Sequence, residues 1–166
     1  MPPPSAPAAP AGVSGFDALT KDQKAQDYWF RRLIAYVIDV ILVYVPLYII
    51  FLLVAVPFLF IGGFGFYALF FGSYIFLWGI IFILYNAFME STSGQSFGKS
   101  FLNLKVVSKS GANPSFVDAF IRNLSKIYWL LLVLDVIVGL AVSKEYSQKW
   151  TDTFLGTRVV SKTQTI

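Results

Sequence analysis

The stretch FRRLIAYVID, residues 30–39, carries two arginines and one aspartate into the start of a very apolar run. After Asp39 the next charged residue is Glu90, so the chain between them has the character of a membrane-embedded segment. A carboxylate in that setting is costly unless it is protonated, hydrated or paired. The nearest cation on the same helix face is Arg32, roughly 10 Å away along the axis, which is too far for contact. Asp39 therefore needs a partner from another part of the chain.

The composition is that of an integral membrane protein, whose first partner is the lipid bilayer. Of the 166 residues, 57% are hydrophobic and 13% are charged, against a charged fraction of about 25% in soluble domains. The net charge of +4 comes from cations outside the long apolar block, which suits a headgroup surface better than nucleic acid. The absence of cysteine and histidine excludes disulfides, zinc and haem ligation, and catalysis by either residue. We expect no cofactor and no enzyme activity.

We expect one membrane domain, residues 33–162, with shorter segments before and after it. Residues 1–15 are rich in proline and alanine and are predicted to be a disordered tail, and residues 163–166 form a second tail. Residues 16–32 mix acidic and basic side chains and end in Tyr28-Trp29-Phe30. This pattern is typical of an amphipathic segment that approaches the membrane and ends in an aromatic belt.

The predicted fold class is an all-α integral membrane protein, a small helical bundle of three main apolar segments. The first span is expected from about Leu33 to Leu53 and the second from about Tyr67 to Phe88, separated by a glycine-rich turn at residues 62–65. The turn is uncharged, whereas the flanks at residues 21–32 and 99–109 are basic. By the positive-inside rule, the N-terminus and both flanks lie in the cytoplasm of a multi-pass protein of the cell membrane.

The third apolar segment, residues 127–142, holds Asp135 near its middle and is short for a straight span. Two interpretations stay open. In the first, the segment crosses once while Arg122 and Lys126 reach back to the headgroups, which places the later cations outside. In the second, a helical hairpin or re-entrant segment breaks near Asp135 to Gly139 and keeps those cations in the cytoplasm. We give the second form slightly more weight.

Two short segments are predicted to form a two-stranded β element on the cytoplasmic side. Apolar and polar residues alternate around residues 102–107, which indicates a strand. Residues 158–162, RVVSK, nearly repeat residues 105–109, KVVSK. Because a lone strand leaves its backbone groups unpaired, we predict that the two segments pair with each other.

The loop SGQSFGKS, residues 93–100, resembles a phosphate-binding loop but fails on spacing. Three residues separate Gly94 from Gly98, where the motif needs four, and a membrane helix precedes the loop in place of a buried strand. We therefore expect neither nucleotide nor nucleic acid as a partner. Gly94, Gly98 and Lys99 remain as a loop motif of unassigned role.

The carboxylates Asp39 and Asp135 are the most informative residues within the apolar segments. The favoured interpretation is that each is neutralised by a cation or capped by hydroxyls and fixes helix packing. The alternative is that both belong to an ion or proton path, the usual hypothesis for such residues in membranes. Asp152 lies in a short polar segment before the last strand, where a helix or turn cap is the simplest role.

Three groups of residues together resemble the RDD family of membrane proteins. They are Arg32, Ala35, Ile38 and Asp39 in the first span, GQSFGK at 94–99 followed by KVV at 105–107, and Asp152 followed by GT at 156–157 and VV at 159–160. The family is named for one arginine and two aspartates, which fall here on Arg32, Asp39 and Asp152. Arg122-Asn123 also fits, and the resemblance covers about Trp29 to Val160.

The resemblance implies a bundle of few membrane helices and a role in transport, including cation/proton exchange. One departure stands immediately before Asp152, where Trp150-Thr151 replaces an aliphatic residue followed by histidine. A proton-transfer role that needs histidine at that place is therefore not supported by the residues.

We hypothesise that Arg32, Asp39, Arg122 and Asp152 converge at the cytoplasmic headgroup level. Asp39 would pair with Arg122, and Arg32 with Asp152, because opposite charges in a partly dry site attract strongly. The result would be a lock between segments that are distant in the sequence.

Two functions remain open. The first is a component of a cation or proton transport system, in which Asp39 or Asp135 binds the ion and a homo-oligomer or larger complex encloses the path. The second is a non-catalytic scaffold or accessory subunit of a larger membrane complex. An enzyme acting on lipid headgroups is least supported, since no nucleophile–base pair or metal set is visible.

Overall fold

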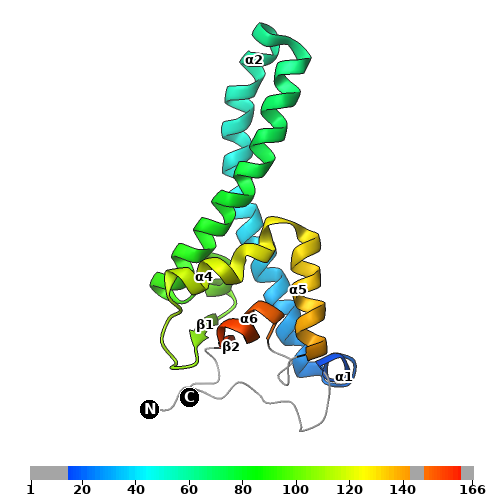
Figure 1. Cartoon of the computed structure of the whole chain (residues 1–166), viewed down its shortest axis with the longest axis vertical. Helices are drawn as coiled ribbons and strands as arrows, with labels where there is room; N and C mark the ends of the chain where they lie inside the picture. Colours follow the sequence, from blue (N-terminus) through cyan, green and yellow to red (C-terminus); the bar gives the residue numbers. More distant parts are fainter. Residues whose placement is uncertain (1–14, 143–147, 162–166) are drawn as a thin grey trace.

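A long helical hairpin dominates the computed structural model, which describes residues 15–142 and 148–161 (Figure 1). Helix α2, Gln23–Ser93, is two helices joined at Gly63, whose φ of 69° and ψ of −178° are non-helical. Glycine adopts this left-handed φ readily because it has no side chain. The predicted glycine-rich turn is therefore confirmed. We call Gln23–Pro57 the first arm and Phe71–Ser93 the second arm; both are long and apolar enough to cross a membrane.

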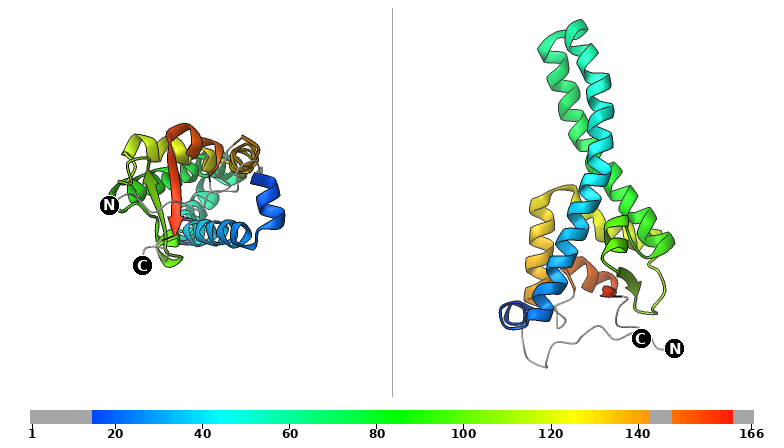
Figure 2. Two further views of the ribbon diagram at one scale, coloured as in Figure 1. Left: turned by 90° about the horizontal axis from the view of Figure 1, so that it is seen from below. Right: turned by 180° about the vertical axis from the view of Figure 1, so that it is seen from behind.

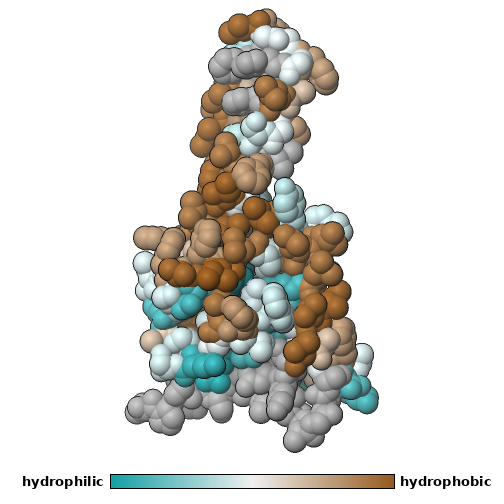
Figure 3. Space-filling model, viewed as in Figure 1, coloured by the Kyte–Doolittle hydropathy of each residue, from teal (hydrophilic) through white to brown (hydrophobic). Residues whose placement is uncertain are grey.

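The hairpin extends well beyond the rest of the molecule (Figures 1 and 2). Apolar side chains cover this projecting part, and hydrophilic ones gather lower down (Figure 3). Aromatic rings join the two arms, with the rings of Phe51 and Tyr74 4.4 Å apart. The Tyr74 hydroxyl donates a hydrogen bond to the Leu47 carbonyl at 2.5 Å. Exposed apolar side chains on all sides of a helix are expected where lipid is the solvent.

The third apolar segment is broken, but not where the sequence suggested. Helix α4, Phe116–Asn123, continues into the short 3-10 helix η1, Leu124–Ile127. Tyr128 is then extended (φ −133°, ψ 134°), and α5, Trp129–Val142, leaves at 114° to the preceding pair. The break predicted near Asp135 to Gly139 is therefore wrong, since α5 is continuous there. Lys149 and Thr151, which lie outside α5, neutralise Asp135 and donate hydrogen bonds to it. The helix therefore does not need to break at Asp135.

The bent pair of α4–η1 and α5 is apolar enough to be one broken span or a re-entrant loop. The described residues therefore contain two helices long and apolar enough to cross a membrane, or three spans if the bent pair counts as one. In Figure 1, α4 lies across the lower part of the hairpin and α5 runs down beside the first arm. The small helix α1, Gly15–Lys21, sits near the lower end of α5 (Figure 1). Residues 23–32, expected to approach the membrane, form the first turns of the first arm, which begins after the cap Asp22.

The predicted strand pair is confirmed. Strand β1, Leu104–Ser108, pairs antiparallel with β2, Thr157–Ser161, so that Val106 lies opposite Val159 (Figure 2). Leu104, Val106 and Val159 pack on Ala35 of the first arm as a small buried cluster. The sheet thus joins the segment that follows the second arm to the last strand, beside the first arm. Lys162 and the tails at 1–14 and 163–166 lie outside the described residues.

Candidate functional site

Glu90 lies at the centre of a group of buried charges near the lower end of the second arm. It is fully buried and forms an ion pair with Lys99. The Arg122 Nε lies 3.5 Å from its Oε2, and the Asn123 side-chain amide donates to the same oxygen at 2.9 Å. From the sequence, Glu90 was noted as the next charge after Asp39 but was given no role. The available signal was its position as the first charge after the long apolar block.

Asp152 forms the second buried carboxylate centre, in the first turn of α6, Trp150–Leu155. Its Oδ2 lies 3.2 Å from Arg32 Nη2, and its Oδ1 lies 3.0 Å from Arg122 Nη2. The contact predicted between Arg32 and Asp152 is present. Arg122 therefore bridges Glu90 and Asp152, two carboxylates from distant parts of the chain. The simple cap role considered for Asp152 understates what this side chain contacts.

Asp39 is not paired with Arg122, so this part of the hypothesis is wrong. Its Oδ1 accepts hydrogen bonds from the Tyr85 hydroxyl at 3.0 Å and the Gly98 amide at 2.8 Å. Its Oδ2 accepts from the Ser96 hydroxyl at 2.5 Å. Arg122 is instead drawn to Glu90 and Asp152, because two buried carboxylates attract it more strongly than one that is already capped. Asp39 thus has neutral donors only among the described residues.

The loop motif now has a structural role. Gly94 ends the second arm in a left-handed conformation (φ 75°), and α3, Phe97–Phe101, follows. A Cβ at Gly98 would lie 2.0 Å from the Ala35 carbonyl oxygen, so only glycine allows the loop this close to the first arm. That approach delivers the backbone amide to Asp39, and Lys99 then reaches Glu90.

Asp135 is neutralised in a second pair on the other side of the site. Lys149 Nζ lies 2.5 Å from Asp135 Oδ2 and also donates to the Arg122 carbonyl at 2.5 Å. The Thr151 amide and hydroxyl donate to Asp135 at 2.8 and 2.9 Å. Asp39 and Asp135 therefore do not share a site. The Asp135 arrangement matches the interpretation of a paired charge that fixes helix packing.

Lys126 differs from the other cations of the site. Its Nζ donates to the Asn86 side-chain carbonyl at 2.7 Å and lies 5.7 Å from the Phe82 ring centre. Within the described residues it forms no ion pair. A lysine held by one neutral acceptor keeps donor capacity for a further anionic group.

We call the nine ionisable side chains of this region the charge cluster. They are Arg32, Asp39, Glu90, Lys99, Arg122, Lys126, Asp135, Lys149 and Asp152. Five of these side chains are basic and four are acidic. No three side chains able to hold a metal come together in residues 15–142 and 148–161.

Burial and pairing shift the ionisation of the cluster in predictable directions. Burial alone raises the pKa of Asp152, but Arg122 and Arg32 outweigh it and hold that pKa below its ordinary 3.8. Burial lowers the pKa of Lys99 below its ordinary 10.5, against the opposing effect of Glu90. The pKa of Lys149 is lowered in the same way, against the effect of two aspartates. The site is thus dry enough for desolvation to matter.

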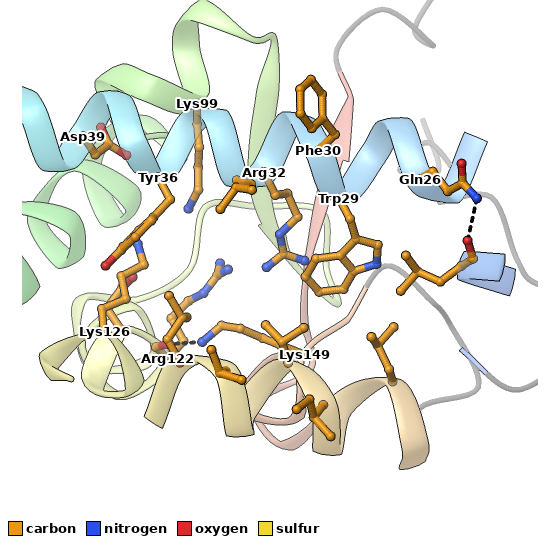
Figure 4. Close-up of a pocket in the computed structure, with 18 residues that line it drawn as sticks. Gln26, Trp29, Phe30, Arg32, Tyr36, Asp39, Lys99, Arg122, Lys126 and Lys149 are labelled. Atoms are coloured by element: carbon orange, nitrogen blue, oxygen red, sulfur yellow. Dashed lines mark hydrogen bonds between the residues drawn. The ribbon is translucent and has the colours of Figure 1, made fainter. Parts of the chain in front are cut away.

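A cavity of about 550 Å³ lies beside the cluster, between the first arm and the α4–α5 segment (Figure 4). All five cations of the cluster line it, whereas Asp39 is its single carboxylate among the described residues. The remainder of the wall is mostly apolar, with Gln26 and Asn123 as polar exceptions, and comes mainly from α5 and the first arm. The cavity therefore combines a positively charged side with a hydrophobic side.

These features define a helical membrane-type protein that ties two apolar arms and a bent helix pair together through buried ion pairs. The model of the RDD family matches residues 28–156, which include Arg32, Asp39, Arg122 and Asp152. The chain belongs to the RDD family. Comparison with curated proteins and with solved structures gives no match.

Proposed function

We propose that this protein is a non-enzymatic, multi-pass subunit of a homo-oligomer or larger membrane complex. One observation carries the proposal: between Asp39 and Glu90 the hairpin has no charged residue, and its projecting part is formed by the two arms of α2 (Figure 1). Two helices cannot enclose a polar path, because each leaves one side to lipid. A role that requires passage across the bilayer therefore needs further copies or another protein.

The charge cluster acts in this proposal as a lock at the cytoplasmic face. Arg32, Glu90, Arg122 and Asp152 join the two arms, α4 and α6, so that the hairpin is held in one orientation. A fixed orientation is what an assembling subunit must offer to its neighbours.

Co-purification tests the proposal. The full chain, extracted in mild detergent at its native expression level, is expected as an oligomer or with a stoichiometric membrane partner. A monomer that carries no partner, while remaining folded by circular dichroism, would contradict it.

Proton transport is the second candidate, and Asp39 favours it. This carboxylate is 1% exposed, lines the cavity and is held by neutral donors, so it can exchange a proton without breaking an ion pair. Asp135 lacks this freedom because Lys149 neutralises it. Flux into reconstituted vesicles should be abolished by Asp39→Asn and unchanged by Lys21→Ala, whose side chain is 78% exposed. Equal flux from both variants would rule Asp39 out as the carrier.

A further inference from the structure

The wall of the cavity is far more positive than the charge cluster as a whole. Five cations and one carboxylate face it, and Glu90, Asp135 and Asp152 are not part of its lining. The single lining carboxylate, Asp39, already accepts three hydrogen bonds, which occupy both of its oxygens. An anion that enters the cavity therefore meets hydrogen-bond donors and little repulsion from carboxylates, whereas a cation is repelled by the basic side chains.

Two of these cations have donors to spare. Arg122 is 1% exposed, and its Nη1 has no hydrogen-bond partner in the described part of the chain. Within residues 15–142 and 148–161, the Asn86 side-chain carbonyl is the one hydrogen-bond acceptor of Lys126. Figure 4 shows the ends of Arg122, Arg32 and Lys99 directed into the same space between the helices. A buried guanidinium nitrogen without an acceptor is costly, and an anionic oxygen placed there removes that cost.

The other side of the cavity is built for a hydrocarbon chain. Leu132, Val133, Val136, Ile137 and Leu140 line it, at positions that fall on one face of α5. Opposite them lies Leu33 of the first arm, which is 57% exposed. Val133 and Ile137 are also exposed, at 42% and 45%. The apolar wall thus continues to the outer surface between α5 and the first arm, where lipid tails would lie.

We propose that the cavity binds one anionic phospholipid, with its phosphate group among Arg32, Arg122 and Lys126 and an acyl chain between α5 and the first arm. Phosphate supplies several anionic oxygens for the spare donors, and basic pockets between membrane helices hold such headgroups. A zwitterionic lipid fits less well, because its ammonium group would face five cations. The volume of the cavity is sufficient for a headgroup of this kind. The proposal is independent of whether the protein forms part of a transport system.

Native mass spectrometry of the full chain in non-ionic detergent tests the proposal. The probes are phosphatidylglycerol, phosphatidylcholine with the same acyl chains, and inorganic phosphate. We expect phosphatidylglycerol to bind at one site at least tenfold more tightly than phosphatidylcholine, and millimolar inorganic phosphate not to displace it. Equal binding of the two lipids would overturn the charge argument, and displacement by inorganic phosphate would overturn the role of the acyl chain.

Two variants locate the bound lipid. Lys126→Gln keeps a donor for Asn86 but removes the charge, and it should weaken phosphatidylglycerol binding about tenfold, the effect of one charge-assisted hydrogen bond. Lys21→Gln, an exposed cation outside the cavity, is the matched control and should leave the affinity unchanged.

Val136→Trp fills the apolar side without altering charge and should abolish binding while the helical content is retained. If Lys126→Gln binds as tightly as Lys21→Gln, or if Val136→Trp still binds, the lipid does not occupy this cavity.

Discussion

Arg122 is the residue on which the buried charges of this protein depend most. It contacts Glu90 and Asp152 at once, and both carboxylates are fully buried. Arg122→Gln leaves them short of positive charge, and breaking a buried pair in this way costs about 3–5 kcal/mol of unfolding free energy. Unfolding in mixed micelles measures the loss. Arg31→Gln is the control, since its pair with Asp27 is exposed and is worth about 0.5 kcal/mol.

The pairings within the charge cluster predict which double variants are coupled. Arg32→Gln and Asp152→Asn remove two partners of one contact, so their effects on unfolding free energy should differ from a simple sum by about 0.5–3 kcal/mol. Asp39→Asn and Arg122→Gln act on separate contacts, so their effects on the free energy of unfolding should be closer to additive. Strong coupling of Asp39 to Arg122 would restore the pairing that the structure rejects.

Acid should weaken the fold through Asp152. Its pKa lies below the ordinary 3.8 in the folded protein, because Arg122 and Arg32 outweigh the effect of burial. The stabilising contribution is therefore complete above pH 3.8 and is lost as the pH falls from there through the folded-state pKa. Thermal unfolding between pH 6 and about pH 3 should show a steeper loss for the unaltered protein than for Asp152→Asn. If the melting temperatures of the two proteins fall in parallel with pH, the pKa of Asp152 is not lowered by folding.

Among the elements, the loop before β1 is the most constrained by close packing. Gly98→Ala places a Cβ against the Ala35 carbonyl and pushes α3 away from Asp39, which should destabilise the protein by about 1–3 kcal/mol. Gly72→Ala is the matched control, because a Cβ there meets nothing within 4 Å. Thermal unfolding of the two variants side by side measures the difference. Equal melting temperatures would mean that the loop does not approach the first arm this closely.

Elements with a local signal were predictable from the sequence. The hairpin followed from two long apolar runs around a glycine-rich turn, and the strand pair from the repeat of KVVSK as RVVSK. The break at Tyr128 was not predictable, because nothing in its neighbours forbids a helix there. The direction of α5 after the break is instead set by its contacts with α6 and α1, which are distant in the sequence.

The candidate site was predictable only in part. Arg32 and Asp152 were paired correctly, whereas Asp39 was assigned a cation that Glu90 and Asp152 hold instead. The choice among several buried partners depends on three-dimensional distances and on backbone donors such as the Gly98 amide. Neither can be deduced from the spacing of residues in the sequence.

At the scale of the whole molecule, hydrophilic and apolar side chains are separated along the long axis. The sheet and the hydrophilic side chains lie in the lower part, and the apolar hairpin projects from it (Figures 1 and 3). This arrangement suits a subunit that is anchored at one face of the bilayer and presents two helices to its neighbours.

The mass of the protein extracted directly into nanodiscs of its native lipids tests the proposed assembly most directly. One chain has a mass of 18.6 kDa. We predict a protein mass of two or more chains, or of one chain with a stoichiometric membrane partner. A folded particle that contains one chain alone would contradict the proposal.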